Sequence, residues 1–413
     1  MAADSPLLMG RPLPSSGAFS GVLEALAFFR DPEFARRRFE RLGDVFETKL
    51  LGQQLVFIRG ERAMTDLLGS NDATEGWWPE SVRQLLGSRS LANRNGADHR
   101  ARRRVVGQLF SAAALRRYSP EIVQLVDQLA AELLAAREPV RLVDRMRRFA
   151  FAVIASVVLG LEGGDVEALF ADFEIWTRAL FSVPIAIPGS PFAKALQARA
   201  RLLDRLRSVL ERAQHAPTGG LDLLSGGLDE VGLPLTDDDL VEQLLLLLFA
   251  GYETTASSLS CLMATLLQHP QSLAWLQEEI HTLAWPPSDS PATPRLDAVV
   301  QEVMRLNPPV GGFFRRTPGP WSWAECVCRR GALCRWRWHR LTASAVAEPL
   351  IWMPSVLNAI SRAERGSRCC PLAVVSGCAS ARRSLSWKSG SWLWVFSSRW
   401  CLTWRLLRIS ALL

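Results

Sequence analysis

Residues 244–255 read LLLLLFAGYETT and lie inside one long helical pattern. The pattern begins after Thr236, a favourable N-cap that is followed by three acidic residues in the first turn, 237–239. It ends at His269, because the residue before Pro270 is disfavoured in the α-helical region. The segment is apolar on nearly all sides, which predicts a central, buried helix. Its unbroken apolar run is too short to span a bilayer.

Small and polar residues interrupt this helix at Ala250, Gly251, Glu253 and Thr254. A glycine within a helix costs about 1 kcal/mol relative to alanine, and a buried glutamate is costly unless it is paired or protonated. Two interpretations are open. The helix packs tightly at Gly251 with Glu253 bonded to a neighbour, or the small residues admit a flat ligand to which the hydroxyl and carboxyl groups deliver protons.

A second motif, EVMRLNPP, occupies residues 302–309. Residues 296–306 have a helical pattern, so Glu302 and Arg305, three positions apart, share one face of that helix. A glutamate and an arginine at this spacing would by themselves indicate only a solvated ion pair.

In this order, A-G-x-E-T-T and E-x-x-R followed by P-P resemble the cytochrome P-450 superfamily, the haem-thiolate monooxygenases. The resemblance covers about residues 10–318 and implies a mainly α fold with small β-sheets (α+β) around a haem, iron protoporphyrin. It also implies that Ala250 and Gly251 make room for oxygen beside the central helix. Thr254 and Glu253 would be the catalytic residues that deliver protons to this oxygen, and Glu302 and Arg305 would form a structural ion pair.

The composition of the chain divides near residue 318. Residues 319–413 contain 14 Lys and Arg against 3 Asp and Glu, with 10 of the 15 tryptophans and 7 of the 8 cysteines. Residues 1–318 are therefore net acidic, with 34 basic against 38 acidic residues. The overall charge of +7 comes from a compositionally foreign tail and gives no argument for nucleic-acid binding.

The N-terminal residues predict a small sheet behind two short helices. Residues 21–29 and 31–42 are helical in pattern, and Arg36, Arg37, Arg38 and Arg41 are expected on a solvated face. Residues 44–51 and 54–58 alternate around Gly52-Gln53, which predicts a β-hairpin, with a further helix at 61–68. The N-terminus has no basic segment followed by an apolar core, so we expect a cytoplasmic, soluble protein without a signal peptide or membrane anchor.

A basic cluster follows at residues 96–104, GADHRARRR. It indicates either a basic helix start on the surface or a nucleic-acid patch, and the acidic balance of residues 1–318 argues against nucleic acid. The resemblance implies a third role, because a His or Trp followed four residues later by Arg binds a haem propionate in the family. His99 and Arg103 have that spacing, and a guanidinium suits a carboxylate.

Helices are also expected at residues 123–134 and 142–159, with 153–159 in the core. Residues 181–192, FSVPIAIPGSPF, predict either a buried apolar connector or, by resemblance, a lid over the substrate channel. Their sequence resembles the corresponding segment in the branch of the family that contains retinoid and steroid hydroxylases. That resemblance implies a large apolar substrate. Residues 216–220 are expected as a flexible loop. Downstream of the E-x-x-R helix, the resemblance implies that Arg315 reaches a propionate.

The family pattern stops near Pro318. The family's thiolate ligand lies in F-G-x-G-x-R-x-C-x-G, and this sequence contains no such string. A shifted reading frame accounts for the tail. New codons can be built from the third base of each residue's codon and the first two bases of the next codon. In this shifted frame, Trp323-Ala324 must give Gly and Trp352-Met353 must give Asp. With permitted codons, residues 370–381 become P-F-G-G-G-V-R-V-C-L-G.

We therefore interpret residues 1–318 as a cytochrome P-450 domain and 319–413 as an aberrant tail, out of frame after a break between Thr317 and Pro320. The alternative is a real Cys/Trp-rich tail with a metal site at Cys326 and Cys328, although the second half of a zinc motif is missing. No axial metal ligand is expected in this frame.

The resemblance implies a monooxygenase that hydroxylates an apolar small molecule with O2 and with electrons from a separate partner, a ferredoxin or reductase. Because the axial Cys loop is missing, the chain is expected to be inactive and its haem binding is in doubt. The alternatives are a haem-free pseudoenzyme and a helical protein that binds an apolar ligand.

Overall fold

The computed structural model describes most of residues 7–337 and divides the chain into two compact units. The described ranges are 7–8, 11–16, 21–31, 33–50, 53–60, 74–215, 219–224, 226–283, 293–310, 312–317, 321–323, 326–328 and 333–337. The first unit draws on residues before 79 and after 309, and the second on residues 79–309. The residues expected as one domain, 1–318, are thus divided between two units, and the first unit continues beyond residue 318.

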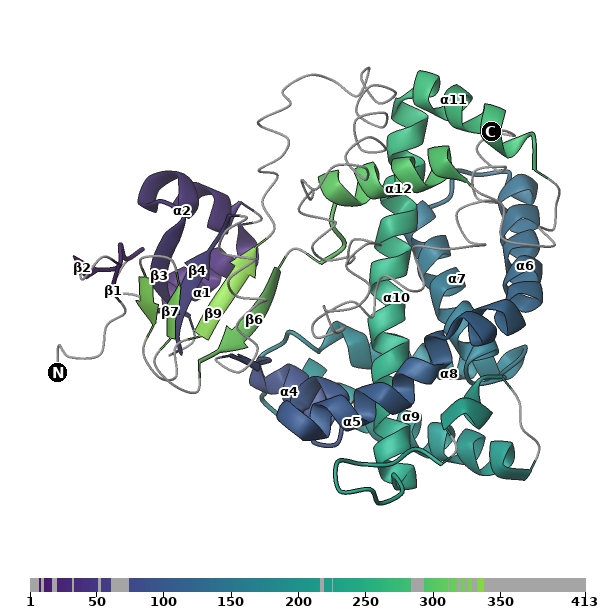
Figure 1. Cartoon of the computed structure of the whole chain (residues 1–413), viewed down its shortest axis with the longest axis horizontal. Helices are drawn as coiled ribbons and strands as arrows, with labels where there is room; N and C mark the ends of the chain where they lie inside the picture. Colours follow the sequence, from purple (N-terminus) through teal and green to yellow (C-terminus); the bar gives the residue numbers. More distant parts are fainter. Residues whose placement is uncertain are drawn as a thin grey trace. The chain divides into compact units, whose positions relative to one another are not determined.

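The described residues of the first unit form two helices and two sheets, as the fold view illustrates (Figure 1). The helices are α1 (Gly21–Arg30) and α2 (Phe34–Leu42). One sheet has the order β3-β4-β9-β6-β5, formed by Val45–Leu50, Gln53–Ile58, Leu333–Arg337, Gly312–Arg316 and Glu75–Gly76. The other has the order β2-β1-β8-β7, formed by Arg11–Pro12, Leu7–Leu8, Cys326–Cys328 and Trp321–Trp323.

The β3–β4 hairpin confirms the alternation around Gly52-Gln53, with Leu50 opposite Gln53 in an antiparallel register. Its inner face packs on α2 through aromatic side chains. The rings of Phe46 and Phe57 are stacked with centroids 4.9 Å apart, and Phe39 meets Phe46 edge-on at 5.0 Å. Burial of such aromatic residues is the main stabilising contribution of a small layer like this one.

One arginine of α2 does not lie on the expected solvated face. Arg36, Arg37 and Arg41 are exposed, as predicted. Arg38 instead donates to both carboxylate oxygens of Glu24 on α1, at 3.0 and 2.8 Å. Both side chains are largely buried. The prediction was wrong for Arg38 because its partner lies on another helix.

The second unit is helical. Its elements are α4 (Glu80–Leu86), η1 (Leu91–Asn93), α5 (Gly96–Gly107), η2 (Gln108–Phe110), α6 (Ala112–Ala135), α7 (Leu142–Val157), α8 (Gly164–Arg178), α9 (Pro191–His215), η3 (Leu221–Leu224), α10 (Asp237–Gln268), α11 (Pro270–Ile280) and α12 (Pro294–Leu306). The described chain is therefore mainly α with small sheets, which confirms the expected fold class.

Helix α10 is the centre of this unit and begins and ends as predicted (Figure 1). The hydroxyl of Thr236 accepts a hydrogen bond from the backbone N–H of Asp239 at 3.2 Å. His269 follows the last turn, and Pro270 opens α11. The helix packs against α7, α9, α11 and α12. Its N-cap and its proline stop are local signals, which is why the sequence located both ends.

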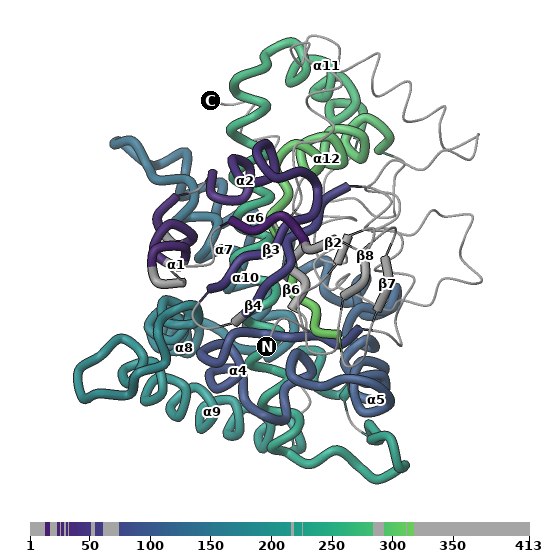
Figure 2. Tube along the Cα trace, turned by 90° about the vertical axis from the view of Figure 1, so that its left-hand side faces the viewer, coloured from purple at the N-terminus to yellow at the C-terminus, as the bar shows by residue number. Residues whose placement is uncertain are grey.

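Helices α11 and α12 lie together at the C-terminal end of α10 (Figures 1 and 2). Their interface is apolar and is formed by Leu262, Leu266, Leu276, Ile280, Leu296, Val299 and Val303. By length and composition, α10 could also cross a membrane, a test that a buried core helix passes as well. Half of its most apolar window is buried in the protein. Packing, rather than the length of the apolar run, therefore identifies it as a core helix.

Some expectations fall outside the described residues. They are the helix at 61–68, most of the loop at 216–220, and the region of the frame break at 318–320. Helices were expected at 123–134 and 142–159, and the structure has α6 and α7 there. The segment 153–159 is buried throughout, as expected for core.

Candidate functional site

The middle of α10 carries polar side chains on an otherwise apolar helix. The hydroxyl of Thr254 donates to the carbonyl oxygen of Ala250 at 2.7 Å, and Ser258 donates to the carbonyl of Thr254 at 2.8 Å. All three residues are partly buried. Threonine and serine that bond one turn back in this way compete with the helix ladder and slightly loosen it. One face of α10 thus has a hydroxyl and a backbone carbonyl side by side.

Gly251 provides close helix packing. A Cβ on Gly251 would overlap Cδ1 of Ile154, which lies on α7. The space beside this glycine is therefore filled by α7, and the room for oxygen that we expected there is not found on that side. Of the two interpretations of Gly251, the structure agrees with tight packing. The partly buried Ala250 remains as the small residue next to Thr254.

Glu253 is exposed rather than buried in the apolar helix, and it is bonded to a neighbour, as one of the two interpretations predicted. Its side chain is 50% accessible. Its two oxygens accept hydrogen bonds from Nε and Nη2 of Arg147 at 2.9 and 2.6 Å. Because these bonds and the charge of Glu253 outweigh the effect of burial, the pKa of Arg147 is raised. The helix rotates Glu253 away from the apolar core and towards α7, and no apolar pattern in the sequence specifies that rotation.

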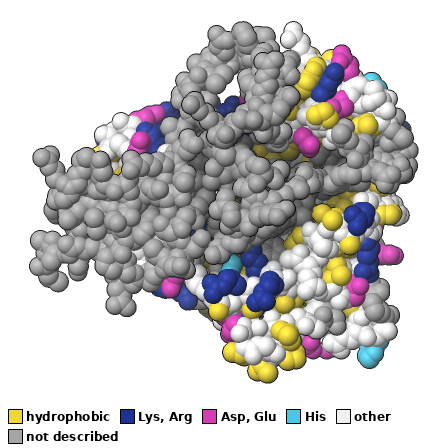
Figure 3. Space-filling model, viewed as in Figure 1, with side chains coloured by type: hydrophobic (Ala, Val, Ile, Leu, Met, Phe, Trp, Pro, Cys, Tyr) yellow, Lys and Arg dark blue, Asp and Glu magenta, His cyan; other side chains and the backbone are white. Residues whose placement is uncertain are grey.

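His99 and Arg103 lie one turn apart on α5 and are both partly buried. Burial lowers the pKa of Arg103 below its ordinary value. In the surface view, Lys and Arg side chains gather over α5 (Figure 3), where Arg100 and Arg104 are exposed. The basic sequence therefore divides between an exposed face and a partly buried one, and His99 and Arg103 share the latter.

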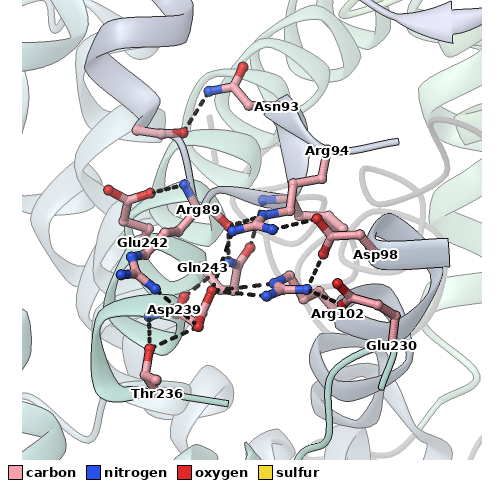
Figure 4. Close-up of polar contacts among 12 residues, drawn as sticks. Arg89, Asn93, Arg94, Asp98, Arg102, Glu230, Thr236, Asp239, Glu242 and Gln243 are labelled. Atoms are coloured by element: carbon pink, nitrogen blue, oxygen red, sulfur yellow. Dashed lines mark hydrogen bonds and ion pairs between the residues drawn. The ribbon is translucent and has the colours of Figure 1, made fainter. Parts of the chain in front are cut away.

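Sequence reasoning missed Arg102, the most buried arginine of the cluster. Arg102 lies among the carboxylates of Asp98, Glu230 and Asp239 (Figure 4). Side-chain exposure is 6% for both Arg102 and Asp239. The signal available in the sequence was the pairing of Asp98 with Arg102 at i and i+4. The other two partners lie more than 120 positions away in the sequence.

The E-x-x-R motif forms the expected ion pair. Nε and Nη2 of Arg305 donate to the two oxygens of Glu302 at 2.7 and 2.6 Å. Both side chains are largely buried, at 13% and 6% exposure. A bidentate geometry of this kind satisfies both charges in a place where neither could be left alone.

Arg315 lies on β6 in the first unit, whereas His99 and Arg103 belong to the second. Its guanidinium donates to the carbonyl of Phe314 at 2.9 Å and lies over the ring of Phe313. Burial lowers the pKa of Arg315 to about 10. No ion pair joins it to a carboxylate within the described residues. A desolvated guanidinium of this kind can bind an anionic group of a ligand by donating hydrogen bonds to it.

The loop at 181–192 is not a buried connector. Phe181, Val183, Ile185 and Ile187 are 52–62% exposed. They occupy alternate positions, and α8 and α9 bracket the loop. The expectation of burial was wrong because an apolar, proline-broken composition does not by itself supply a packing partner. The lid interpretation stays a prediction.

No group of three or more potential metal ligands occurs among the residues that the structure describes. The side chains of Cys326 and Cys328, the alternative metal site, lie outside that description, although the backbone there forms β8.

Comparisons with known proteins identify the relatives of this chain. The sequence profile of the family "Cytochrome P450" matches residues 29–322. Cytochrome P450 120 of Synechocystis sp. is 35% identical over 300 residues, covering 71% of this chain and 67% of the relative. Human cytochrome P450 26C1 is 33% identical over 317 residues, covering 68% of this chain and 61% of the relative. The chain thus spans about three fifths of the length of its vertebrate relatives.

Solved structures agree with this assignment. Retinoic-acid-bound cyanobacterial CYP120A1 superposes with a TM-score of 0.75 at 29% identity, covering 94% of this chain and 88% of that one. P450BioI in complex with an acyl carrier protein has a TM-score of 0.61 at 18% identity, with 75% and 78% covered, and shows the shared fold alone.

Proposed function

This chain belongs to the cytochrome P450 family, and we propose that its fold serves a haem-dependent monooxygenase that hydroxylates an apolar small molecule with O2. The observation that carries the proposal is the arrangement in mid-α10. A threonine hydroxyl and a small residue share one helix face, and the carboxylate next in sequence lies at the solvent side.

The residues present fit a haem on its propionate side. Haem carries two carboxylates, and they need cationic partners in a partly desolvated place. Arg315 is such a cation, since burial lowers its pKa and no described carboxylate pairs with it. His99 and Arg103 share one partly buried face of α5. We propose His99 and Arg103 in the second unit, and separately Arg315 in the first unit, as residues that bind a propionate.

When bound, the haem iron would supply oxygen activation and C–H oxidation, chemistry that no side chain can perform. The protein would supply proton delivery and the exclusion of water. The Thr254 hydroxyl can pass a proton to a group beside α10, and Glu253, exposed on the same helix, can take a proton from solvent. Arg147 holds the Glu253 carboxylate in place. Electrons would come from a separate protein partner.

The substrate proposal rests on the relatives. One solved neighbour is described as bound to retinoic acid, and the loop at 181–192 offers four exposed apolar side chains between α8 and α9. We propose a large apolar substrate of the retinoid type. Binding of retinoic acid, measured as a spectral shift of the haem in the restored-frame protein, tests this. No shift with retinoic acid, together with shifts from unrelated apolar compounds, would refute the substrate and keep the enzyme class.

The axial ligand is the part that does not fit. Residues 319–413 contain no F-G-x-G-x-R-x-C-x-G string, and the family match ends at residue 322. That end lies close to the frame break inferred between Thr317 and Pro320. We propose that the break separates the domain from its cysteine loop and that this chain is inactive because of it.

Resequencing the coding DNA from the codon of Arg305 to the stop is the deciding experiment. One missing or extra base near codons 317–320 would restore the loop, and the restored protein should show the carbon-monoxide absorption band of thiolate-ligated haem. The present chain should not show that band. An unchanged DNA sequence would mean that the organism makes this tail, and would favour a haem-free pseudoenzyme or a binding protein.

A further inference from the structure

An ionic cluster connects α5 to the first turns of α10 (Figure 4). We use "ionic cluster" for Arg89, Arg94, Asp98, Arg102, Glu230, Asp239 and Glu242. Gln243 reinforces it, accepting from the backbone N–H of Leu91 and donating to the carbonyl of Arg89, both at 2.8 Å. The cluster thus ties the segment before α5, α5 itself and α10 to one another.

Arg102 is the centre of this cluster. Its Nε and Nη2 donate to one oxygen of Asp239 at 3.3 and 3.2 Å, and Nη1 donates to Glu230 at 2.9 Å and to Asp98. The other oxygen of Asp239 accepts from the Thr236 hydroxyl at 2.8 Å. Each of the three guanidinium nitrogens therefore has an acceptor, which restricts the side chain to one orientation.

Helix geometry links this anchored face to the next one. Asp98 and Arg102 are four residues apart and form one column along α5, and His99 and Arg103 form the adjacent column. Consecutive residues on an α-helix are separated by about 100°. Arg102 is anchored to Asp239 on α10 and to Glu230, and Asp98 is paired with Arg94 in the segment before α5. These contacts define the rotation of α5 about its axis. That rotation decides where His99 and Arg103 point.

The anchor is on the helix that also carries Thr254. Asp239 lies in the first turn of α10 and Thr254 lies fifteen residues later, about 22 Å along the axis at 1.5 Å per residue. The position of His99 and Arg103 and the position of Thr254 are therefore both set by α10. Loss of the Arg102–Asp239 contact would let α5 rotate or shift, while Ala250 and Thr254 on α10 stayed in place.

We propose that Arg102 is a positioning residue, which sets the rotation of α5 on α10 so that His99 and Arg103 face the carboxylates of a bound porphyrin. The inference rests on the proposed function and extends it. Arg102 itself does not touch the porphyrin. It acts through the neighbouring column of the helix.

The test measures binding of hemin and of hemin dimethyl ester, in which both propionates are blocked, to the full 413-residue chain. Arg102→Gln removes the charge-assisted contacts that hold α5 on α10, so His99 and Arg103 should no longer face the propionates. We expect hemin binding to weaken about tenfold and ester binding to change by less than about twofold. Arg104→Gln is the matched control, an exposed arginine on the same helix. It should leave both affinities unchanged.

A double-mutant cycle separates positioning from general stability. If Arg102 acts through Arg103, Arg102→Gln should weaken hemin binding much less in an Arg103→Gln background than in the unchanged chain. Equal losses in both backgrounds, or equal losses for hemin and its ester, would mean that Arg102 only stabilises the fold, and would overturn the inference.

The outcome also separates this inference from the proposed function. A chain that binds hemin and its ester equally well, or that binds neither, has no working propionate site, so the proposed propionate contacts and the positioning role would both fail. A chain that prefers hemin, and keeps its preference with Arg102→Gln, would overturn the positioning role alone. If Arg102→Gln does not fold, Glu230→Gln removes one partner from the rim of the cluster. It should reduce the preference for hemin about threefold by removing one charged contact, and an unchanged preference would count against the inference.

Discussion

Arg147 and Glu253 form a two-point ion pair between α7 and α10, with donor–acceptor distances of 2.9 and 2.6 Å. The pair is partly open to solvent, with side-chain exposures of 36% and 50%. Its strength is therefore limited by hydration and salt, whatever its geometry. Glu253 is thus held in one place without being withdrawn from water, and the proposed proton relay needs both conditions.

For this pair, Arg147→Gln should lower the free energy of unfolding by only about 0.2–1 kcal/mol, the range of exposed ion pairs. Urea denaturation at low and at high salt measures it, and the difference from the unchanged chain should shrink as salt rises. A loss above about 2 kcal/mol, independent of salt, would show that the pair behaves as a buried one.

Gly251 should tolerate a side chain only if α7 gives way. Gly251→Ala should destabilise by about 1–3 kcal/mol through overlap with Ile154, less the helix propensity gained, about 1 kcal/mol. In an Ile154→Val background, which removes Cδ1, the same change should be neutral or stabilising. Gly107→Ala is the control, because nothing lies within 4 Å of a Cβ there. Thermal denaturation of the four variants tests this, and strict additivity would contradict it.

Acid should weaken the second unit through Asp239. Burial alone would raise the pKa of Asp239, but hydrogen bonds from Thr236 and Arg102 and the charges of Arg102 and Arg89 outweigh it, so its pKa is lowered. A carboxyl group with a lowered folded-state pKa stabilises the fold above its unfolded pKa. It loses that contribution as the pH falls, here below about pH 4.

Asp239→Asn should therefore destabilise the chain at pH 7 and flatten the loss of stability below pH 4. Denaturation midpoints of both proteins measured across that range provide the check. Asp237→Asn, an exposed neighbour in the same helical turn, serves as the control. A parallel pH dependence for Asp239→Asn and the unchanged chain would contradict the assignment.

Replacing Tyr118 with phenylalanine should make the protein more stable. Its hydroxyl is buried and has no hydrogen-bond partner within the described part of the chain, and burying an unpaired hydroxyl costs about 1–3 kcal/mol. Desolvation raises the pKa of Tyr118 to about 12. The folded state therefore loses stability as the pH rises above about 10, the pKa of an unfolded tyrosine. Tyr118→Phe should gain about 1 kcal/mol and weaken this alkaline loss, and a loss of stability in urea at pH 7 would reveal a hidden partner.

Breaking the Glu302–Arg305 pair should be among the most damaging changes. Glu302→Gln leaves a buried guanidinium without its carboxylate, which costs about 3–5 kcal/mol. The double variant Glu302→Leu, Arg305→Met should cost less than Glu302→Gln, since no buried charge is left alone. Chemical denaturation compares them. A single variant more stable than the double one would contradict this account.

The sequence located what is determined locally. The ends of α10 follow from Thr236 and Pro270, the β3–β4 hairpin from alternation, and the Glu302–Arg305 pair from a spacing of three. Each depends on residues within one or two turns, so periodicity and capping predict them. The family match then confirmed the class that these motifs had indicated.

The failures involve partners distant in the chain. Glu253 was expected to be buried because its helix is apolar, yet Arg147, 106 positions away, fixes it at the surface. Arg102 escaped notice because Asp239 lies 137 positions from it. One of the two interpretations of the loop at 181–192 was a buried connector, but its composition contains no information about a covering element. Rotation of a helix and pairing between helices are tertiary properties that pattern arguments do not reach.

The order of strands in the larger sheet has a consequence during synthesis on the ribosome. β9 lies between β4 and β6 and pairs with β4 in parallel, so residues 53–58 wait for residues 333–337 to be translated. At 5–20 residues per second, that wait is roughly 15–55 s. During this time the nascent chain exposes the open edge of β4, a surface that invites pairing with other chains. We therefore expect the first unit to be more prone than the helical unit to pairing with other chains during synthesis.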